Sequence, residues 1–182
     1  LVMYLISVPF LVGTEYILKI WLGEVPMYAV LFTQLLIIER LIDSLNNGIA
    51  EIVFADGNIS FYQISTNTIR LLSIVAGFVF LYTGYPPYSL LYCYIIATVL
   101  IVLFKHVSLA RISNIDTKCI YRDSYIPSVA VTLLTLPVFF YRVFENPLLD
   151  ICIKELYVVV VIFMIGLRGD ERRKILVTLK RK

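Results

Sequence analysis

The stretch ISFYQISTNTIRLLSIVAGFVFLY, residues 59–82, decides the fold of this chain. It is long and mostly apolar, and Arg70 is its only charged residue. A helix that crosses a membrane needs about 20 predominantly apolar residues, which this stretch provides. We therefore predict a membrane-spanning helix over residues 59–82.

The composition of the whole chain agrees with a membrane protein. Of its 182 residues, 60% are apolar and only 16% are charged, whereas a soluble domain is typically about half apolar and a quarter charged. A soluble domain of this length would need a polar surface. The long apolar stretches cannot supply one, so we expect the chain to face lipid.

Six segments are long and apolar enough to be spans, and turn residues separate several of them. The glycines and prolines of residues 23–26 and 84–87 interrupt helices, and residues 55–58 form a compact turn. We predict an all-α, polytopic membrane helix bundle that forms one domain over residues 1–167, followed by a basic tail over 168–182. The predicted spans are residues 1–21, 27–53, 59–82, 89–104, 125–141 and 148–167.

Lysine and arginine residues indicate how the bundle is oriented. They gather in the loop over 105–124, which holds Lys105, Arg111, Lys118 and Arg122, and in the tail over 168–182. Cytoplasmic loops carry an excess of these residues. Both segments follow even-numbered spans, so a single threading puts both of them, and both chain ends, in the cytoplasm.

The second predicted span carries polar residues midway along its length. Charge at the bilayer centre costs at least about 2.5–3.5 kcal/mol per residue, so such groups rarely face lipid. At helical spacing they form two adjacent stripes. One stripe is Glu39, Asp43, Asn46 and Asn47, and the other is Arg40, Ser44, Asn47 and Glu51.

The third predicted span has a polar face of its own, formed by Gln63, Thr66, Asn67 and Arg70. A tight turn would make the second and third spans antiparallel neighbours, with Arg40 and Arg70 at similar depth. Arginine stays charged at any working pH and matches phosphate oxygens with two parallel hydrogen bonds.

Two interpretations of these residues stay open. In the first, they line a wet cavity that binds an anionic substrate. The substrate-binding candidates are then Arg40, Arg70, Asn46, Asn47, Gln63 and Asn67, and the ion-coupling candidates are Glu39, Asp43 and Glu51. In the second, the acidic residues only neutralise the arginines in a buried structural network.

The remaining charged residues of the predicted spans indicate no binding site. Glu15 and the pair Lys154 and Glu155 are expected to be structural, with Lys154 extending its amine outward to the interface. We find no catalytic motif, no phosphate-binding glycine loop and no clustered Cys/His spacing. We therefore expect no enzyme activity, no cofactor, no metal and no nucleic-acid partner.

Four stretches resemble bacterial polysaccharide flippases. The run ILKIWLGEVP at 17–26 resembles their Trp-Leu-Gly…Pro junction, and residues 51–64 resemble the turn between two of their spans. GYPPY at 84–88 is similar to the next turn, and GLRGDERR at 166–173 is similar to their C-terminal ending. The matches follow the family's order, although Asp56 and Ser60 depart from its pattern.

The resemblance implies a Wzx-like O-antigen flippase of the multidrug/oligosaccharidyl-lipid/polysaccharide exporter superfamily. Such proteins move an undecaprenyl-pyrophosphate-linked oligosaccharide across the bacterial inner membrane by alternating access between two lobes. The chain would then be the C-terminal portion, and its expected partners are membrane lipids, the lipid-linked oligosaccharide, an N-terminal lobe and polysaccharide polymerase machinery. No family motif covers Arg40 or Arg70, so their roles rest on the physical argument.

Two other functions are compatible with the sequence. A cation-coupled multidrug exporter of the same superfamily would use Glu39 and Asp43 as its substrate site. A non-transporting membrane scaffold or fragment would use the polar faces only for packing.

Overall fold

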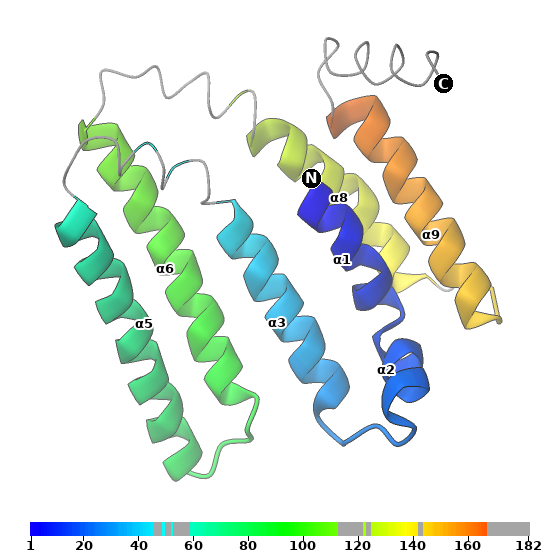
Figure 1. Ribbon diagram of the computed structural model, residues 1–182, viewed down its shortest axis with the longest axis horizontal. Coiled ribbons are helices and arrows are strands. Elements are labelled where there is room, and N and C mark those ends of the chain that lie inside the picture. The colour runs from blue at the N-terminus through cyan, green and yellow to red at the C-terminus, as the bar shows by residue number, and fades with distance from the viewer. Residues whose placement is uncertain are drawn as a thin grey trace. The chain divides into compact units, whose positions relative to one another are not determined.

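The computed structural model describes residues 1–45, 49, 52, 59–112, 122, 125–141 and 144–166 (Figure 1). Within these ranges every regular element is a helix and none is a strand, as the predicted all-α class requires. The chain forms two compact units, Ile17–Thr117 and the pair of segments Leu1–Tyr16 and Lys118–Lys182. Helix α2 (Thr14–Leu22) begins in one unit and ends in the other.

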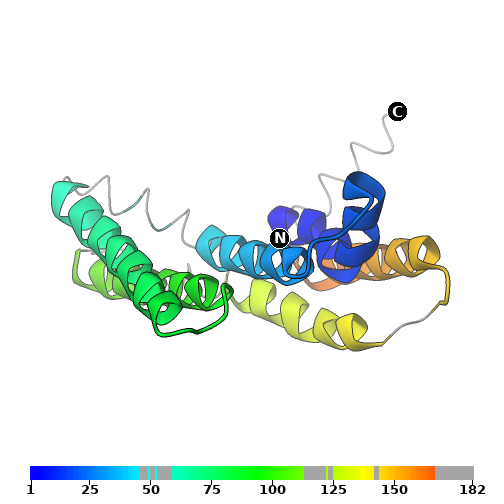
Figure 2. The same cartoon turned by 90° about the horizontal axis from the view of Figure 1, so that it is seen from below.

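Unit Ile17–Thr117 is built around helix α6 (Ser89–Ile112). Both α3 (Ala29–Ser44) and α5 (Ile59–Tyr82) pack against it (Figures 1 and 2). The sequence predicted that α3 and α5 would be direct neighbours. Instead, each packs mainly on α6, and a buried hydrogen bond from Thr98 of α6 to Glu39 of α3 helps to hold α3 there.

The connection between α5 and α6 is the tight Gly-Pro turn that the sequence predicts. Gly84 has φ +87°, a conformation that other residues rarely adopt. Close to the turn, a Cβ atom added to Gly77 would lie 2.9 Å from Leu90 Cγ and 3.2 Å from Leu90 Cα. A glycine at 77 therefore allows α5 and α6 to approach closely.

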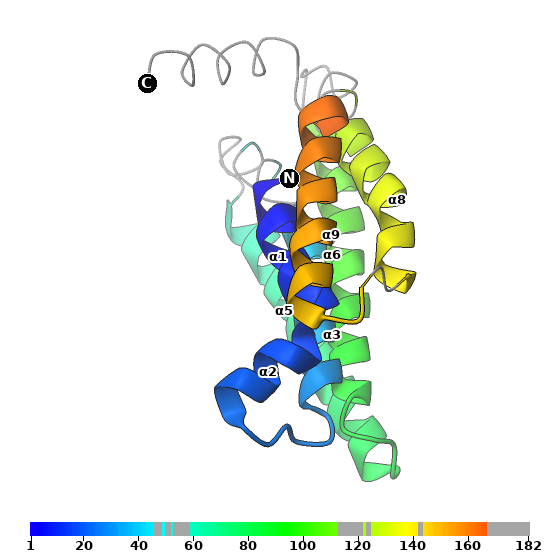
Figure 3. The ribbon, with the colours of Figure 1, turned by 90° about the vertical axis from the view of Figure 1, so that its right-hand side faces the viewer.

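The other unit contains α1 (Val2–Val12), α8 (Ile126–Phe140) and α9 (Pro147–Val161), which continues into the short π-helix η2 (Ile162–Gly166). Helix α9 packs against both α1 and α8 (Figure 3). The Tyr4 and Thr135 hydroxyl groups share a hydrogen bond between α1 and α8. Asn146 caps α9 by accepting a 3.1 Å hydrogen bond from the Leu148 amide.

Two helices are long and apolar enough to cross a membrane: α5 with 24 residues and the 21 residues Ser89–Leu109 of α6. Helices α1 and α2 pass the same test together but are bent by 73°, so the described residues offer up to three such spans. Residues Ile126–Phe139 of α8 form a shorter apolar helix. The part of the chain that the structure describes thus shows fewer candidate spans than the six predicted.

The predicted spans differ from the observed helices at particular residues. The third span matches α5 at both ends. The first predicted span is broken at Gly13, where α1 ends. Pro9, inside α1, has no N–H for a helical hydrogen bond. The Thr14 hydroxyl donates a hydrogen bond to the Phe10 carbonyl. The second predicted span continues to 53, but α3 ends at Ser44; residues 46–48, 50–51 and 53 lie outside the described ranges, as does the tail over 168–182.

The fourth predicted span ends too early. We expected a polar loop from Lys105, but α6 continues through Lys105 and His106 to Ile112. The physical reason is that no glycine or proline occurs between residues 89 and 112 to end the helix. The start of the predicted cytoplasmic loop is therefore wrong, while Lys118 lies outside the described residues.

Candidate functional site

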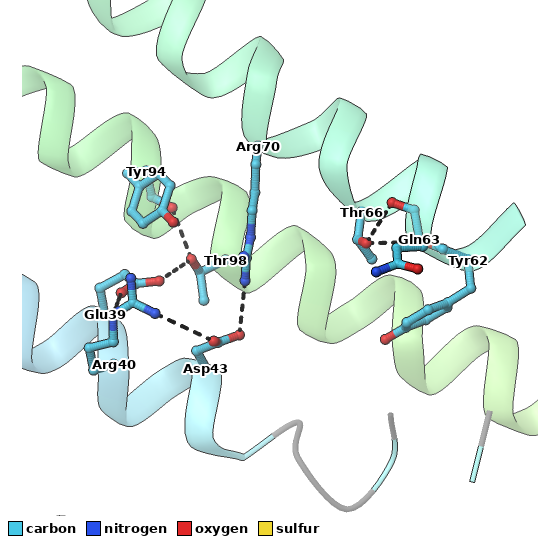
Figure 4. A network of polar contacts seen from close by, with 9 residues as sticks. All are labelled: Glu39, Arg40, Asp43, Tyr62, Gln63, Thr66, Arg70, Tyr94 and Thr98. Atoms are coloured by element: carbon cyan, nitrogen blue, oxygen red, sulfur yellow. Dashed lines mark hydrogen bonds and ion pairs between the residues drawn. The ribbon is translucent and has the colours of Figure 1, made fainter. Parts of the chain in front are cut away.

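A cluster of charged side chains lies where α3, α5 and α6 meet (Figure 4). We call Glu39, Arg40, Asp43 and Arg70 the ionic cluster. Glu39 and Arg40 lie in the last third of α3, Asp43 is the last but one residue of that helix, and Arg70 lies halfway along α5. The cluster thus lies on helices whose other residues are largely apolar.

Glu39 is the buried member of the cluster. Its side chain is 1% exposed, and its Oε1 accepts a 2.8 Å hydrogen bond from the Thr98 hydroxyl of α6. Its other oxygen, Oε2, lies 3.1 Å from Arg40 Nε. A buried carboxylate is costly unless it is paired and hydrogen-bonded, and Glu39 has both kinds of partner.

Asp43 lies between the two arginines. Its Oδ1 is 3.5 Å from Arg70 Nη2, and its Oδ2 is 3.9 Å from Arg40 Nη1. Two guanidinium groups from different helices therefore share one carboxylate. The two arginines, which the sequence analysis placed at similar depth, both reach Asp43, although α3 and α5 each pack mainly on α6.

Exposure increases across the ionic cluster. The side chains are 1% exposed for Glu39, 22% for Asp43, 35% for Arg70 and 52% for Arg40. The Arg70 Nε is buried and has no hydrogen-bond partner. The cluster therefore presents two partly exposed cationic groups, and one of them has an unused donor. Guanidinium groups in this state can bind an anion with more than one oxygen.

The residues of the polar face predicted on α5 differ in how deeply they are buried. Thr66 is buried, and its hydroxyl lies 3.1 Å from both the Tyr62 and the Gln63 carbonyl oxygens (Figure 4). Gln63 and Asn67 are exposed, and among the described residues no hydrogen bond or ion pair joins their side chains to the ionic cluster. Their substrate-binding roles stay predictions. The candidates Asn46, Asn47 and Glu51 lie outside the described residues.

Sequence reasoning missed two residues of α6. Thr98 is completely buried and holds Glu39. Lys105, which we had placed in a loop, is 9% exposed, and its Nζ lies 5.7 Å from the centre of the Tyr62 ring, within cation–π range. Helical spacing could have found both, because Thr98 and Lys105 are seven residues apart and so share a face.

A separate ion pair lies inside the other unit. Lys154 Nζ is 2.7 Å from Asp150 Oδ2, one turn apart on α9, and their side chains are 3% and 7% exposed. Asp150 also accepts a 3.3 Å hydrogen bond from the Phe144 amide. The expectation that Lys154 extends outward is wrong, because a carboxylate on the same face holds the amine in the interior.

No protein-family model matches this chain, and comparisons with curated proteins and with solved structures also find no match. The described residues alone define the class. They form an all-helical chain with two or three helices able to cross a membrane, and charged clusters lie within its helices.

Proposed function

We propose that this chain belongs to a multi-pass membrane transporter that moves a lipid-linked oligosaccharide across the bacterial inner membrane for O-antigen, capsular or exopolysaccharide synthesis. The resemblance to Wzx-like flippases supplies the substrate class, an undecaprenyl-pyrophosphate carrier, and the alternating-access mechanism. Arg40 and Arg70 bind the pyrophosphate. Membrane lipids and polysaccharide polymerase machinery are the proposed partners.

One observation carries the proposal: Arg40 and Arg70 flank a single carboxylate and remain 52% and 35% exposed within apolar helices. Charged residues at mid-membrane are costly and commonly mark a substrate or ion pathway. A phosphate group offers several oxygens to two guanidinium groups at once. The pair is therefore suited to an anion that enters from a wet cavity.

The proposed membrane arrangement keeps six spans with both ends in the cytoplasm. Helices α5 and α6 supply two spans, and the bent pair α1 and α2 supplies a third. Helices α3, α8 and α9 supply the rest, and η2 extends α9 by five residues. A second lobe covers the exposed side of Arg40 and Arg70, since lipid would not solvate these groups.

The drug-exporter alternative is less well supported. A cation site needs exposed carboxylate oxygens, but the Glu39 side chain is only 1% exposed, and its Oε1 accepts from Thr98. Its Oε2 makes no hydrogen bond but lies 3.1 Å from the cationic Arg40 Nε, which disfavours a second cation there. Asp43 is likewise shared by two arginines. These contacts favour an anionic substrate over a cationic one.

The structural alternative has a specific observation in its favour, because each arginine of the ionic cluster already has a carboxylate partner. In a purely structural network, charge-preserving variants fold and function normally. In a phosphate site, replacing arginine by lysine loses the two-pronged contact even though the charge remains.

The test uses Arg40→Ala, Arg70→Ala and the double variant Arg40→Lys/Arg70→Lys in the protein's own bacterial host. Surface polysaccharide is measured and divided by the amount of protein in the membrane. The proposal expects a loss of at least about tenfold in all three. Thr68→Ala, at an exposed position of α5, is the matched control and keeps normal export. Normal polysaccharide in all three arginine variants would overturn the proposal.

A further inference from the structure

The two carboxylates of the ionic cluster are held very differently. Glu39 is 1% exposed, accepts a 2.8 Å hydrogen bond from Thr98 and lies 3.1 Å from Arg40 Nε. Asp43 is 22% exposed and reaches the arginines only at 3.5 and 3.9 Å. Strong N–H···O bonds between charged groups measure about 2.7–2.9 Å. Asp43 therefore makes only long, partly solvated contacts, while Glu39 has one short, buried hydrogen bond from Thr98.

We propose that Asp43 is an internal counter-anion, which occupies the arginine pair when no substrate is bound and is displaced by the phosphate of the substrate. This inference rests on the proposed function, because it assumes that Arg40 and Arg70 bind an anion. It assigns separate roles to the two carboxylates. Glu39 fixes the orientation of Arg40, and Asp43 competes with the ligand.

The geometry explains why Asp43 is the group that leaves. Asp43 and Arg40 are three residues apart on α3, and the carboxylate meets Arg40 at 3.9 Å. A phosphate group has more oxygens and no backbone tether, so it can approach Arg40 and Arg70 at normal hydrogen-bond distance. The Arg70 Nε also lacks a hydrogen-bond partner, but it is buried, so the phosphate meets the outer nitrogens of the guanidinium groups. The exposed part of Asp43 lets its carboxylate remain hydrated after it leaves.

The charge balance of the ionic cluster predicts how the loss of the Asp43 charge changes phosphate binding. The two arginines and two carboxylates of the ionic cluster sum to zero, so within the cluster no positive charge is left for an incoming anion while Asp43 stays in place. Removing the charge of Asp43 leaves the arginine pair with one uncompensated positive charge. Binding of a phosphate compound then becomes tighter, and release of the substrate becomes slower.

The test measures binding to the full chain in lipid nanodiscs for the wild type and Asp43→Asn. The probes are farnesyl pyrophosphate, which carries a lipid tail, and inorganic pyrophosphate, which does not. We expect Asp43→Asn to bind farnesyl pyrophosphate about 5- to 30-fold more tightly, the range for loss of two partly exposed ion-pair contacts. Glu145→Gln removes one negative charge at an exposed position and serves as the matched control, with unchanged affinity.

The arms of the experiment separate the possible results. A gain with both probes identifies the pyrophosphate as the competing group, and a gain with farnesyl pyrophosphate alone identifies a lipid-linked one. Asp43→Ser, a second variant without the charge, gives the same gain and replaces Asp43→Asn if that variant fails to fold. Affinity equal to or below the wild type in both variants would overturn the inference.

The failure of this inference differs from the failure of the proposed function. If wild-type binding is lost in Arg40→Ala and Arg70→Ala but Asp43→Asn brings no gain, only the role of Asp43 is wrong. If Arg40→Ala and Arg70→Ala bind both probes like the wild type, the arginine site itself is wrong.

Discussion

The hydroxyl of Thr98 on α6 donates a 2.8 Å hydrogen bond to Oε1 of Glu39 on α3, and both side chains are almost fully buried. This contact links two helices that are far apart in the sequence. It also orients Glu39 so that its second oxygen meets Arg40. Arg40, which we propose binds the phosphate, thus lies against a buried carboxylate that is itself held by a threonine.

Thr98→Val keeps the shape of the side chain but removes the hydroxyl. Glu39 then loses a hydrogen bond in a buried site, and we expect the free energy of unfolding to fall by about 1–3 kcal/mol. Thermal unfolding of the purified protein in detergent measures the effect. Thr98→Ser keeps the hydroxyl and is the control. Equal stability of Thr98→Val and the wild type would show that the contact does not matter.

The buried pair of Asp150 and Lys154 provides a second prediction. Lys154→Met alone leaves an uncompensated carboxylate in the interior, and we expect it to lower the free energy of unfolding by about 3–5 kcal/mol. The double variant Asp150→Asn/Lys154→Met removes both charges and regains much of that loss. A double-mutant cycle on denaturation measures the coupling. Additive effects of the two substitutions would contradict the observed 2.7 Å pairing.

Close packing of α5 on α6 provides a third prediction. Gly77→Ile places a branched side chain against the backbone of Leu90, where even a Cβ atom lies at 3.2 Å. We expect a loss of about 1–3 kcal/mol from overpacking. Val75→Ile, on the same helix but exposed, is the control and stays near wild type. Equal melting temperatures for the two variants would argue against the observed contact.

The position of Lys105 provides a fourth prediction. Native cysteines are replaced by serine, and single cysteines are then introduced by Lys105→Cys and Glu145→Cys. Because residue 105 is buried in α6 and residue 145 is exposed, we expect a maleimide added to permeabilised membranes to label position 145 at least about tenfold faster. Labelling of positions 105 and 145 at similar rates would instead support the polar loop from Lys105 that the sequence predicts.

The sequence was most informative where a single physical constraint dominates. The apolar run over 59–82 predicts α5 at both ends, because its length and the flanking turns leave few alternatives. The proximity of Arg40 and Arg70 was also predictable, since charges in apolar helices need polar partners.

The sequence pattern could not predict which helices pack against one another. Position along the chain suggested that α3 and α5 pair directly, but pairing also depends on the surface of α6, which lies later in the sequence. Thr98 looked like one polar residue in an apolar run, and only its neighbour Glu39 gives it a role. Lys154 has a suitable stem for reaching the interface, but Asp150 on the same helix face gives it a closer partner.

The most direct measurement of the central claim is photo-crosslinking of the protein in native membranes with a photoreactive polyprenyl pyrophosphate, followed by peptide mapping. We predict labelled peptides from α3 and α5, around Arg40 and Arg70, and loss of the label in Arg40→Ala/Arg70→Ala. Undiminished labelling in that double variant, or labels confined to peptides from α8 and α9, would contradict the claim that this arginine pair binds the phosphate of a lipid-linked substrate.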